Sequence, residues 1–151
     1  SDSECCGRIM YHYQVKLLKV IDGDTVDVDV DLGFDVWMRN QRIRLHGIDT
    51  PESRTRDREE KRFGIRAKQH LSHMIATEIE HGPLVGADTK KQISLQSLGR
   101  GKFGRILGVL FVDGVNVNEK MIEDHHAVAY HGQSKDEIME AHLANRQKLT
   151  V

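Results

Sequence analysis

Strict alternation of apolar and acidic residues marks the clearest element of this chain, residues 26–32. Val26, Val28 and Val30 alternate with aspartates, so the valines lie on one face and the carboxylates on the other. This period of two predicts a half-buried β-strand, and the glycine at position 33 ends it. Apolar-leaning runs at 15–21 and 36–45 predict neighbouring strands, the second of them with a bulge or a break.

After a polar loop that contains Pro51, the period changes to that of a helix. Ala67, Leu71, Met74 and Ile75 follow helical spacing, which predicts a helix over 59–79. Two further strands and two short helices are then expected. The strands are 93–98 and 104–112, separated by a glycine-rich basic turn at 99–102; the helices are 118–126, with Asn118 as N-cap, and 134–148, with a Ser134/Glu137 capping box.

Five short strands with a helix between the third and fourth are typical of one architecture. This order predicts an α+β fold, a five-stranded OB-fold β-barrel with helices appended at its C-terminus. At 151 residues the chain has the length of one domain. We place that domain at residues 15–151 and interpret 1–14 as an N-terminal extension that could be disordered.

The net charge of −1 argues against a nucleic-acid partner, but the distribution of charge changes this interpretation. Residues 39–105 contain 15 Lys and Arg against 8 Asp and Glu, a local excess of seven positive charges. Such segregation can present a basic face to a phosphate backbone. The alternative, that these charges are only a solvated surface, is equally compatible with the sequence.

Location and assembly are weakly constrained by composition. No apolar run approaches the roughly 20 residues of a membrane span, and none near the start resembles a signal peptide. The adjacent Cys5 and Cys6 cannot form a disulfide framework, which favours a reducing compartment. We therefore expect no membrane association and a cytoplasmic location. No feature predicts a protein partner, so a monomer is expected.

Three short clusters carry residues suited to cutting a phosphodiester. That reaction needs carboxylates to hold a hard cation, arginine forks for the phosphate oxygens, and one more acid to activate water. Each cluster alone is a weak signal, but together and in this order they are specific. They are Asp22-Gly23-Asp24-Thr25, Arg44-Leu45-His46-Gly47-Ile48-Asp49-Thr50-Pro51-Glu52, and Lys102-Phe103-Gly104-Arg105.

Through these clusters the chain resembles the staphylococcal nuclease family. The resemblance runs from about Val20 to Ala129 and includes a Gly64-x-x-Ala67 helix and the start of a helix at Val117-Asn118-Glu119. It implies a calcium-dependent nuclease acting on DNA and/or RNA. The family hydrolyses the 5′ P–O bond and leaves 3′-phosphate ends.

The resemblance also implies a role for each matching residue. Asp24, Asp49 and the backbone carbonyl of Thr50 match the Ca²⁺ ligands, and Asp22 matches an acid close to the metal. The remaining matches concern catalysis: Glu52 corresponds to the carboxylate proposed to activate water, and Arg44 and Arg105 correspond to the arginines that grip the phosphate.

Substrate contacts are where the chain departs from the family. Phe103 replaces a tyrosine; its ring can stack on a base but cannot donate to a phosphate, a task for which Lys102 remains. A second stacking residue corresponds to Tyr130 or to His131. The spacer between Asp24 and Arg44 is long, so its hairpin should protrude. The aspartates at 27, 29 and 31 should point away from the cleft, because they would repel nucleic acid.

A different class of function is a non-catalytic binding module on the same fold. Such a module would be expected to lack one of the three groups that act on the phosphate or on water. Arg44, Glu52 and Arg105 are all present, which favours catalysis.

Overall fold

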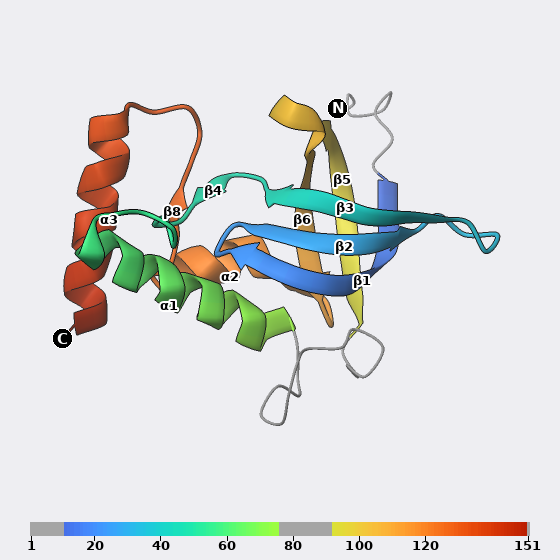
Figure 1. The fold of residues 1–151 in the computed structure, drawn as a ribbon, viewed down its shortest axis with the longest axis horizontal. Helices are drawn as coiled ribbons and strands as arrows, with labels where there is room; N and C mark the ends of the chain where they lie inside the picture. The colour runs from blue at the N-terminus through green and yellow to red at the C-terminus, as the bar shows by residue number, and fades with distance from the viewer. Residues whose placement is uncertain (1–10, 76–91, 151) are drawn as a thin grey trace.

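A closed, mixed β-barrel of five strands forms the body of the protein (Figure 1). The computed structural model describes residues 11–75 and 92–150. Four strand pairs are antiparallel, and the parallel pairing of β3 with β6 closes the barrel. The predicted five-stranded OB-type barrel is confirmed. Its strands are β1 (Tyr11–Asp22), β2 (Thr25–Asp31), β3 (Trp37–Leu45), β5 (Ile93–Arg100) and β6 (Ile106–Val112).

Three helices and three two-residue strands complete the fold. Helix α1 lies between the third and fourth barrel strands, as predicted, and packs Ala67, Leu71 and Ile75 into the core with no exposed surface. β4 pairs with β8, which brings the chain that follows α2 back beside the segment that follows β3. The remaining elements are α1 (Arg58–Ile75), α2 (Val117–Glu123), α3 (Lys135–Thr150), β4 (Ile48–Asp49), β7 (Val115–Asn116) and β8 (Val128–Ala129).

Strand β2 shows why the alternation is a reliable signal. Its valines at 26, 28 and 30 are at most 2% exposed and line the barrel interior. Opposite Asp29, strand β3 carries two residues, Arg39 and Asn40, which is the predicted bulge. The Asp29 carboxylate accepts hydrogen bonds from the Asn40 amide at 2.8 Å and from Arg39 Nη1 at 3.0 Å, so it holds the bulge in place.

Two boundaries differ from those expected. Strand β1 begins at Tyr11 and pairs with β5 from that residue on, so positions 11–14 belong to the domain and not to an N-terminal extension. Residues 1–10 and the expected helix end at 76–79 lie outside the described residues. The N-cap of α2 is Asn116, whose side chain accepts a hydrogen bond from the Glu119 amide, and not Asn118.

Asn118 has a different task. It is 4% exposed, and its amide donates to the His46 and Gly108 carbonyls and accepts from the Leu110 amide. A buried amide that satisfies three backbone groups ties the end of β3 to β6. The capping box of α3 is confirmed, because Ser134 and Glu137 exchange hydrogen bonds.

The connection between β2 and β3 extends well beyond the barrel, as its length predicted (Figure 1). Phe34 at its tip is 99% exposed. In the part of the chain that the structure describes, no helix has both the length and the apolar character needed to cross a bilayer.

Candidate active site

The first and second sequence clusters meet at the guanidinium of Arg44, at the end of β3. Arg44 Nη2 lies 3.4 Å from Asp24 Oδ2 and 3.8 Å from Asp49 Oδ1. Nη1 donates to the Leu45 carbonyl at 2.8 Å, which fixes the side chain. Two carboxylates from separate turns therefore converge on one partly buried arginine.

The turn that carries Asp24 is seated by contacts that require a glycine beside it. A Cβ on Gly23 would lie 2.8 Å from the Ala67 Cβ on α1 and 3.1 Å from the Thr50 side chain. Asp24 itself accepts hydrogen bonds from Thr25 Oγ1 at 2.9 Å and from the Thr50 amide at 3.3 Å. The glycine thus allows the turn to approach both the helix and the second cluster closely.

A second glycine sets the position of Glu52. A Cβ on Gly64 would lie 2.2 Å from the Glu52 carbonyl oxygen, so the backbone of the loop rests directly on helix α1. The Glu52 amide donates to the Glu60 carboxylate at 3.2 Å, and the Ser53 hydroxyl donates to Asp22. The Gly64-x-x-Ala67 pattern therefore has a physical reason: both small residues let site backbone approach the same helix face.

Burial and crowding perturb two of these acids. Burial raises the pKa of Asp24, and the carboxylate of Asp49 adds to this effect, while Arg44 opposes it. Burial also raises the pKa of Glu52, together with the negative charges of Asp22 and Asp24. The four acids Asp22, Asp24, Asp49 and Glu52, called the carboxylate cluster below, therefore form a strongly negative site with one arginine in it.

The third cluster reaches the same end of the barrel through the parallel pairing of β3 with β6. Arg44, near the end of β3, pairs with Leu107 near the start of β6, and Arg105 lies two positions before Leu107. The Lys102–Arg105 turn is held by the Gly101 amide, which donates to the Arg105 carbonyl at 2.7 Å, and by Arg105 Nε, which donates to the Lys102 carbonyl at 3.4 Å. Phe103 adopts a left-handed φ of 62° and is 94% exposed. The turn therefore presents a phenyl ring to solvent beside an arginine.

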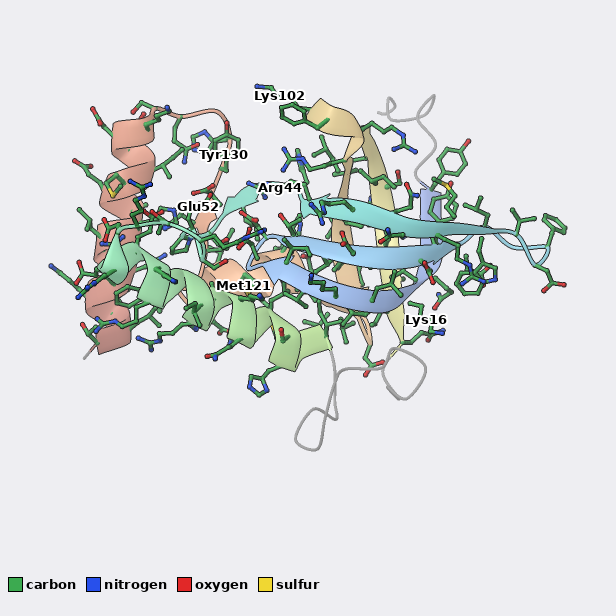
Figure 2. The ribbon with its side chains drawn as sticks, viewed as in Figure 1. Lys16, Arg44, Glu52, Lys102, Met121 and Tyr130 are labelled. Atoms are coloured by element: carbon green, nitrogen blue, oxygen red, sulfur yellow. The ribbon has the colours of Figure 1, made fainter. Side chains whose placement is uncertain are left out.

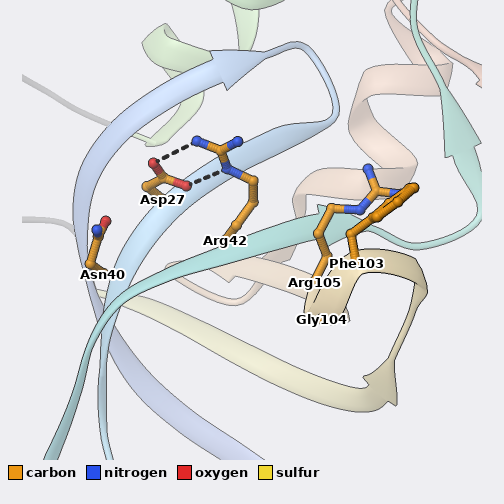
Figure 3. Close-up of a pocket in the computed structure, with 6 residues that line it drawn as sticks. All are labelled: Asp27, Asn40, Arg42, Phe103, Gly104 and Arg105. Atoms are coloured by element: carbon orange, nitrogen blue, oxygen red, sulfur yellow. Dashed lines mark hydrogen bonds and ion pairs between the residues drawn. The ribbon is translucent and has the colours of Figure 1, made fainter.

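A pocket of about 510 Å³ opens between this turn and the face of β2 and β3 (Figure 3). Phe103 and Arg105 line one side, and Asp27, Asn40 and Arg42 line the other. The expectation that Asp27 points away from the cleft is therefore wrong. Its charge is matched by Arg42, whose Nε and Nη2 donate to the carboxylate at 2.9 and 3.2 Å.

Tyr130 and His131 are the two alternatives for a second stacking residue, and both follow β8. Figure 2 shows Tyr130 on the side of α3 and Lys102 on the side of the barrel. The Tyr130 amide donates to the Gly47 carbonyl at 2.8 Å, and its side chain is 46% exposed. His131 is exposed, and its amide donates to Gln133. Neither residue lines the pocket that contains Phe103.

One residue of the site gave no signal in the sequence. His142, on α3, is 8% exposed and places Nε2 at 2.8 Å from Asp49 Oδ2. It lies in an ordinary helical segment far from the three clusters. Only the folded chain brings it to Asp49.

The oxygen atoms of Asp24, Asp49 and Thr50 are the candidate ligands for a cation at this site. Among residues 11–75 and 92–150, no group of three or more His, Cys, Asp or Glu side chains is arranged to hold a metal ion. Asp24 and Asp49 nevertheless converge, and Thr50 between the two turns has a buried hydroxyl with no hydrogen-bond partner. Two carboxylates with a backbone carbonyl suit a hard cation that keeps several waters.

Comparison with known proteins places these features in a family. A family model described as "Staphylococcal nuclease homologue" matches residues 42–149, more than half of the chain. The micrococcal nuclease of Shigella flexneri is 28% identical over an alignment of 151 residues, gaps included. This alignment covers 91% of this chain and 72% of the relative.

Two other relatives are matched over a smaller part of their length. Protein ParB of Escherichia coli is 30% identical over 135 residues, 82% of this chain and 62% of ParB. The thermonuclease of Staphylococcus hyicus is 26% identical over 113 residues, 72% of this chain and 54% of that protein. The chain thus spans less than two thirds of these two curated relatives. With its barrel, the meeting of its first two clusters at Arg44 and the matched family model, this chain belongs to the staphylococcal nuclease family.

Proposed function

We propose that this chain is a calcium-dependent nuclease that hydrolyses DNA and/or RNA and leaves 3′-phosphate ends. The observation that carries the proposal is the convergence of Asp24 and Asp49 on Arg44, with Glu52 in the same negative cluster. Arginine and acids in this arrangement suit a phosphate and a cation together. The names of the micrococcal nuclease and thermonuclease relatives support the same class of reaction.

Asp24 and Asp49 would hold Ca²⁺ with the Thr50 carbonyl, and Asp22 would lie close to it without binding it directly. A bound divalent cation would neutralise charge on the phosphate oxygens. The raised pKa values of Asp24 and Glu52 support this assignment, because crowded carboxylates attract a cation that offsets their repulsion.

Glu52 would accept the proton of the attacking water. Its raised pKa makes it a stronger base than an ordinary glutamate, and its backbone is fixed against Gly64 and Glu60. Arg44 and Arg105 would donate to the phosphate oxygens as negative charge increases there. Because guanidinium donors are planar and always charged, they suit this task better than lysine.

The Lys102–Arg105 turn would bind the nucleotide beside the cleaved bond. Phe103 is exposed and can stack on a base of DNA or RNA without reading its sequence. Lys102 would contact a phosphate. Tyr130, or alternatively His131, would provide a second surface for stacking, and Tyr130 lies toward α3 (Figure 2).

A digestion assay tests the proposal directly. Wild type, Glu52→Gln and the control Glu140→Gln, which changes an exposed acid on α3, are compared on DNA and RNA with Ca²⁺, with Mg²⁺ and with chelator. We expect Ca²⁺-dependent cleavage by wild type and by the control. Loss of a general base should lower kcat about 10²–10⁴-fold in Glu52→Gln.

End-labelling of the products identifies which side of the phosphate is cut. Cleavage that survives both chelation and Glu52→Gln would contradict the mechanism. If wild type binds nucleic acid but cuts neither substrate, the competing assignment, a non-catalytic binding module, is correct.

A further inference from the structure

The C-terminal helix supplies the closest partner of Asp49. Helix α3 places His142 Nε2 at 2.8 Å from Asp49 Oδ2, and both side chains are at least half-buried. The two residues are separated by 93 positions in the sequence. Because a carboxylate ion only accepts hydrogen bonds, Nε2 must carry the proton and donate it.

This bond assigns a different partner to each oxygen of Asp49. Oδ2 is held by His142, whereas Oδ1 faces Arg44 Nη2 at 3.8 Å. The same Nη2 lies 3.4 Å from Asp24 Oδ2. Rotation of the Asp49 carboxylate is therefore restricted, and its other oxygen is directed toward the guanidinium that also contacts Asp24.

Helix α3 is itself fixed by neighbours of His142 on the same helix face. Asn145 Nδ2 donates to the Ala127 carbonyl at 3.1 Å, and Arg146 Nη1 donates to Glu59 at 3.2 Å. The Arg146 guanidinium also lies 5.6 Å from the centre of the Phe63 ring. The position of helix α3 is therefore fixed by contacts of Asn145 and Arg146, which do not depend on the hydrogen bond between His142 and Asp49.

We propose that His142 is a positioning residue that orients Asp49 for cation binding. The inference rests on the proposed function, which makes Asp49 a ligand of Ca²⁺. Hydrogen bonds to the far side of a ligand fix its orientation, and losing one typically weakens metal binding about 10–100-fold. His142 itself touches neither cation nor phosphate. It acts through the Asp49 carboxylate, and its effect on cation binding depends on the N–H of Nε2 more than on the volume of the imidazole ring.

The experiment measures Ca²⁺ binding to the folded protein by calorimetry, without nucleic acid. His142→Phe keeps a ring but removes the donor, whereas His142→Gln restores an N–H at a similar reach. Asn145→Ala is the matched control, because it removes the hydrogen bond from α3 to the Ala127 carbonyl and does not affect Asp49 directly. Thermal unfolding of each variant is recorded in parallel.

We expect His142→Phe to raise the Kd for Ca²⁺ about 10–100-fold and His142→Gln to recover most of this loss. Asn145→Ala should lower the unfolding midpoint but leave the Kd within about twofold of wild type. In cleavage assays the Ca²⁺ concentration for half-maximal rate should follow the Kd, with KM for DNA unchanged. If His142→Phe does not fold, His142→Asn, whose amide is too short to reach, takes its place.

Three other results would each rule out the proposed role of His142, and they differ in what they imply for the metal site. Unchanged Ca²⁺ affinity in the donor-free variant overturns the positioning role while leaving the proposed nuclease intact. Equal weakening in Asn145→Ala and His142→Phe shows that His142 only seats the helix. If the wild-type protein binds no Ca²⁺, the proposed metal site fails, and the role of His142 fails with it.

Discussion

The two sides of the active site differ in how firmly they are held. The backbone that carries the carboxylate cluster packs closely against α1. Asp24 is only 9% exposed, and Asp49 is hydrogen-bonded to His142 on α3. The Lys102–Arg105 turn instead is exposed, and Phe103 has a backbone conformation that disfavours a side chain. Groups that stabilise developing charge must be fixed in advance, whereas a stacking ring needs only to be accessible. Substitutions in the carboxylate cluster and at Arg44 should therefore lower kcat, whereas loss of the Phe103 ring should mainly weaken substrate binding.

The largest effect is expected for Arg44→Lys, which keeps the charge but loses the planar fork. Because a preorganised donor contributes about 10²–10³-fold to kcat, cleavage should fall by that factor with little change in stability. Arg39→Lys, on the same strand but paired with Asp29, is the control and should retain wild-type kcat. Equal activity in the two variants would remove Arg44 from catalysis.

Next in size is Gly64→Ala. Alanine favours helices, but its Cβ would overlap the Glu52 carbonyl at 2.2 Å, and this atom belongs to backbone that cannot turn aside. We expect about 1–3 kcal/mol of destabilisation in denaturant unfolding, accompanied by reduced kcat. Ile65→Ala, an exposed neighbour on α1, serves as the control. A more stable, fully active Gly64→Ala protein would show that the loop does not rest on the helix as described.

Acid should weaken the scaffold behind the carboxylate cluster. Burial lowers the pKa of His126 to about 4, and the nearby charges of His70 and Arg66 add to this, while Asp124 opposes it. His126 is therefore protonated near pH 6.5 in the unfolded chain, but only near pH 4 in the folded chain. Between these values, the free energy of unfolding should fall by about 1–3 kcal/mol as the pH is lowered.

The measurement compares the pH dependence of unfolding in wild type and His126→Phe. The difference between the two curves isolates this histidine from the acids that titrate in the same range. His131→Gln, an exposed change, should follow wild type. Parallel curves for wild type and His126→Phe would exclude His126 as the source of acid sensitivity.

The smallest effect has opposite signs in stability and binding. Phe103→Gly should relieve the left-handed backbone and stabilise the fold by up to about 1 kcal/mol. Losing a stacking surface should raise KM for DNA by roughly five- to tenfold, with kcat nearly unchanged. Phe103→Tyr, which restores a ring, separates the two effects because it should keep a low KM. A KM that does not respond to either change would show that the ring makes no contact with substrate.

The local patterns predicted much of the fold because they report which face of each element is buried. The valines of 26–30, the Ser134 capping box and the helix around Ala67 each needed only near neighbours in the chain. The N-cap at Asn116 was missed because two asparagines stand two positions apart, and only tertiary contacts show that Asn118 serves buried backbone instead.

The site was predictable to the extent that its residues lie in short motifs. Asp24, Arg44, Asp49 and Glu52 could be proposed from two of the three clusters, and the structure brings these four together. His142 could not be predicted, because a lone histidine in a helix carries no information about a partner 93 residues away. The expectation for Asp27 was wrong, because strand alternation shows that its side chain lies on the outer face of β2. It does not show which part of that face lies opposite the Lys102–Arg105 turn.

The parallel pairing of β3 with β6 also has a consequence for the order of folding. The segments that carry Arg44 and Arg105 come together only when that pairing forms, and it joins Ile43 to Ile106 across about sixty residues of intervening chain. The antiparallel hairpins are local and can assemble earlier, whereas contacts of such long range are slow to form. Recovery of cleavage during refolding should therefore lag behind recovery of β-sheet signal and report the moment of barrel closure.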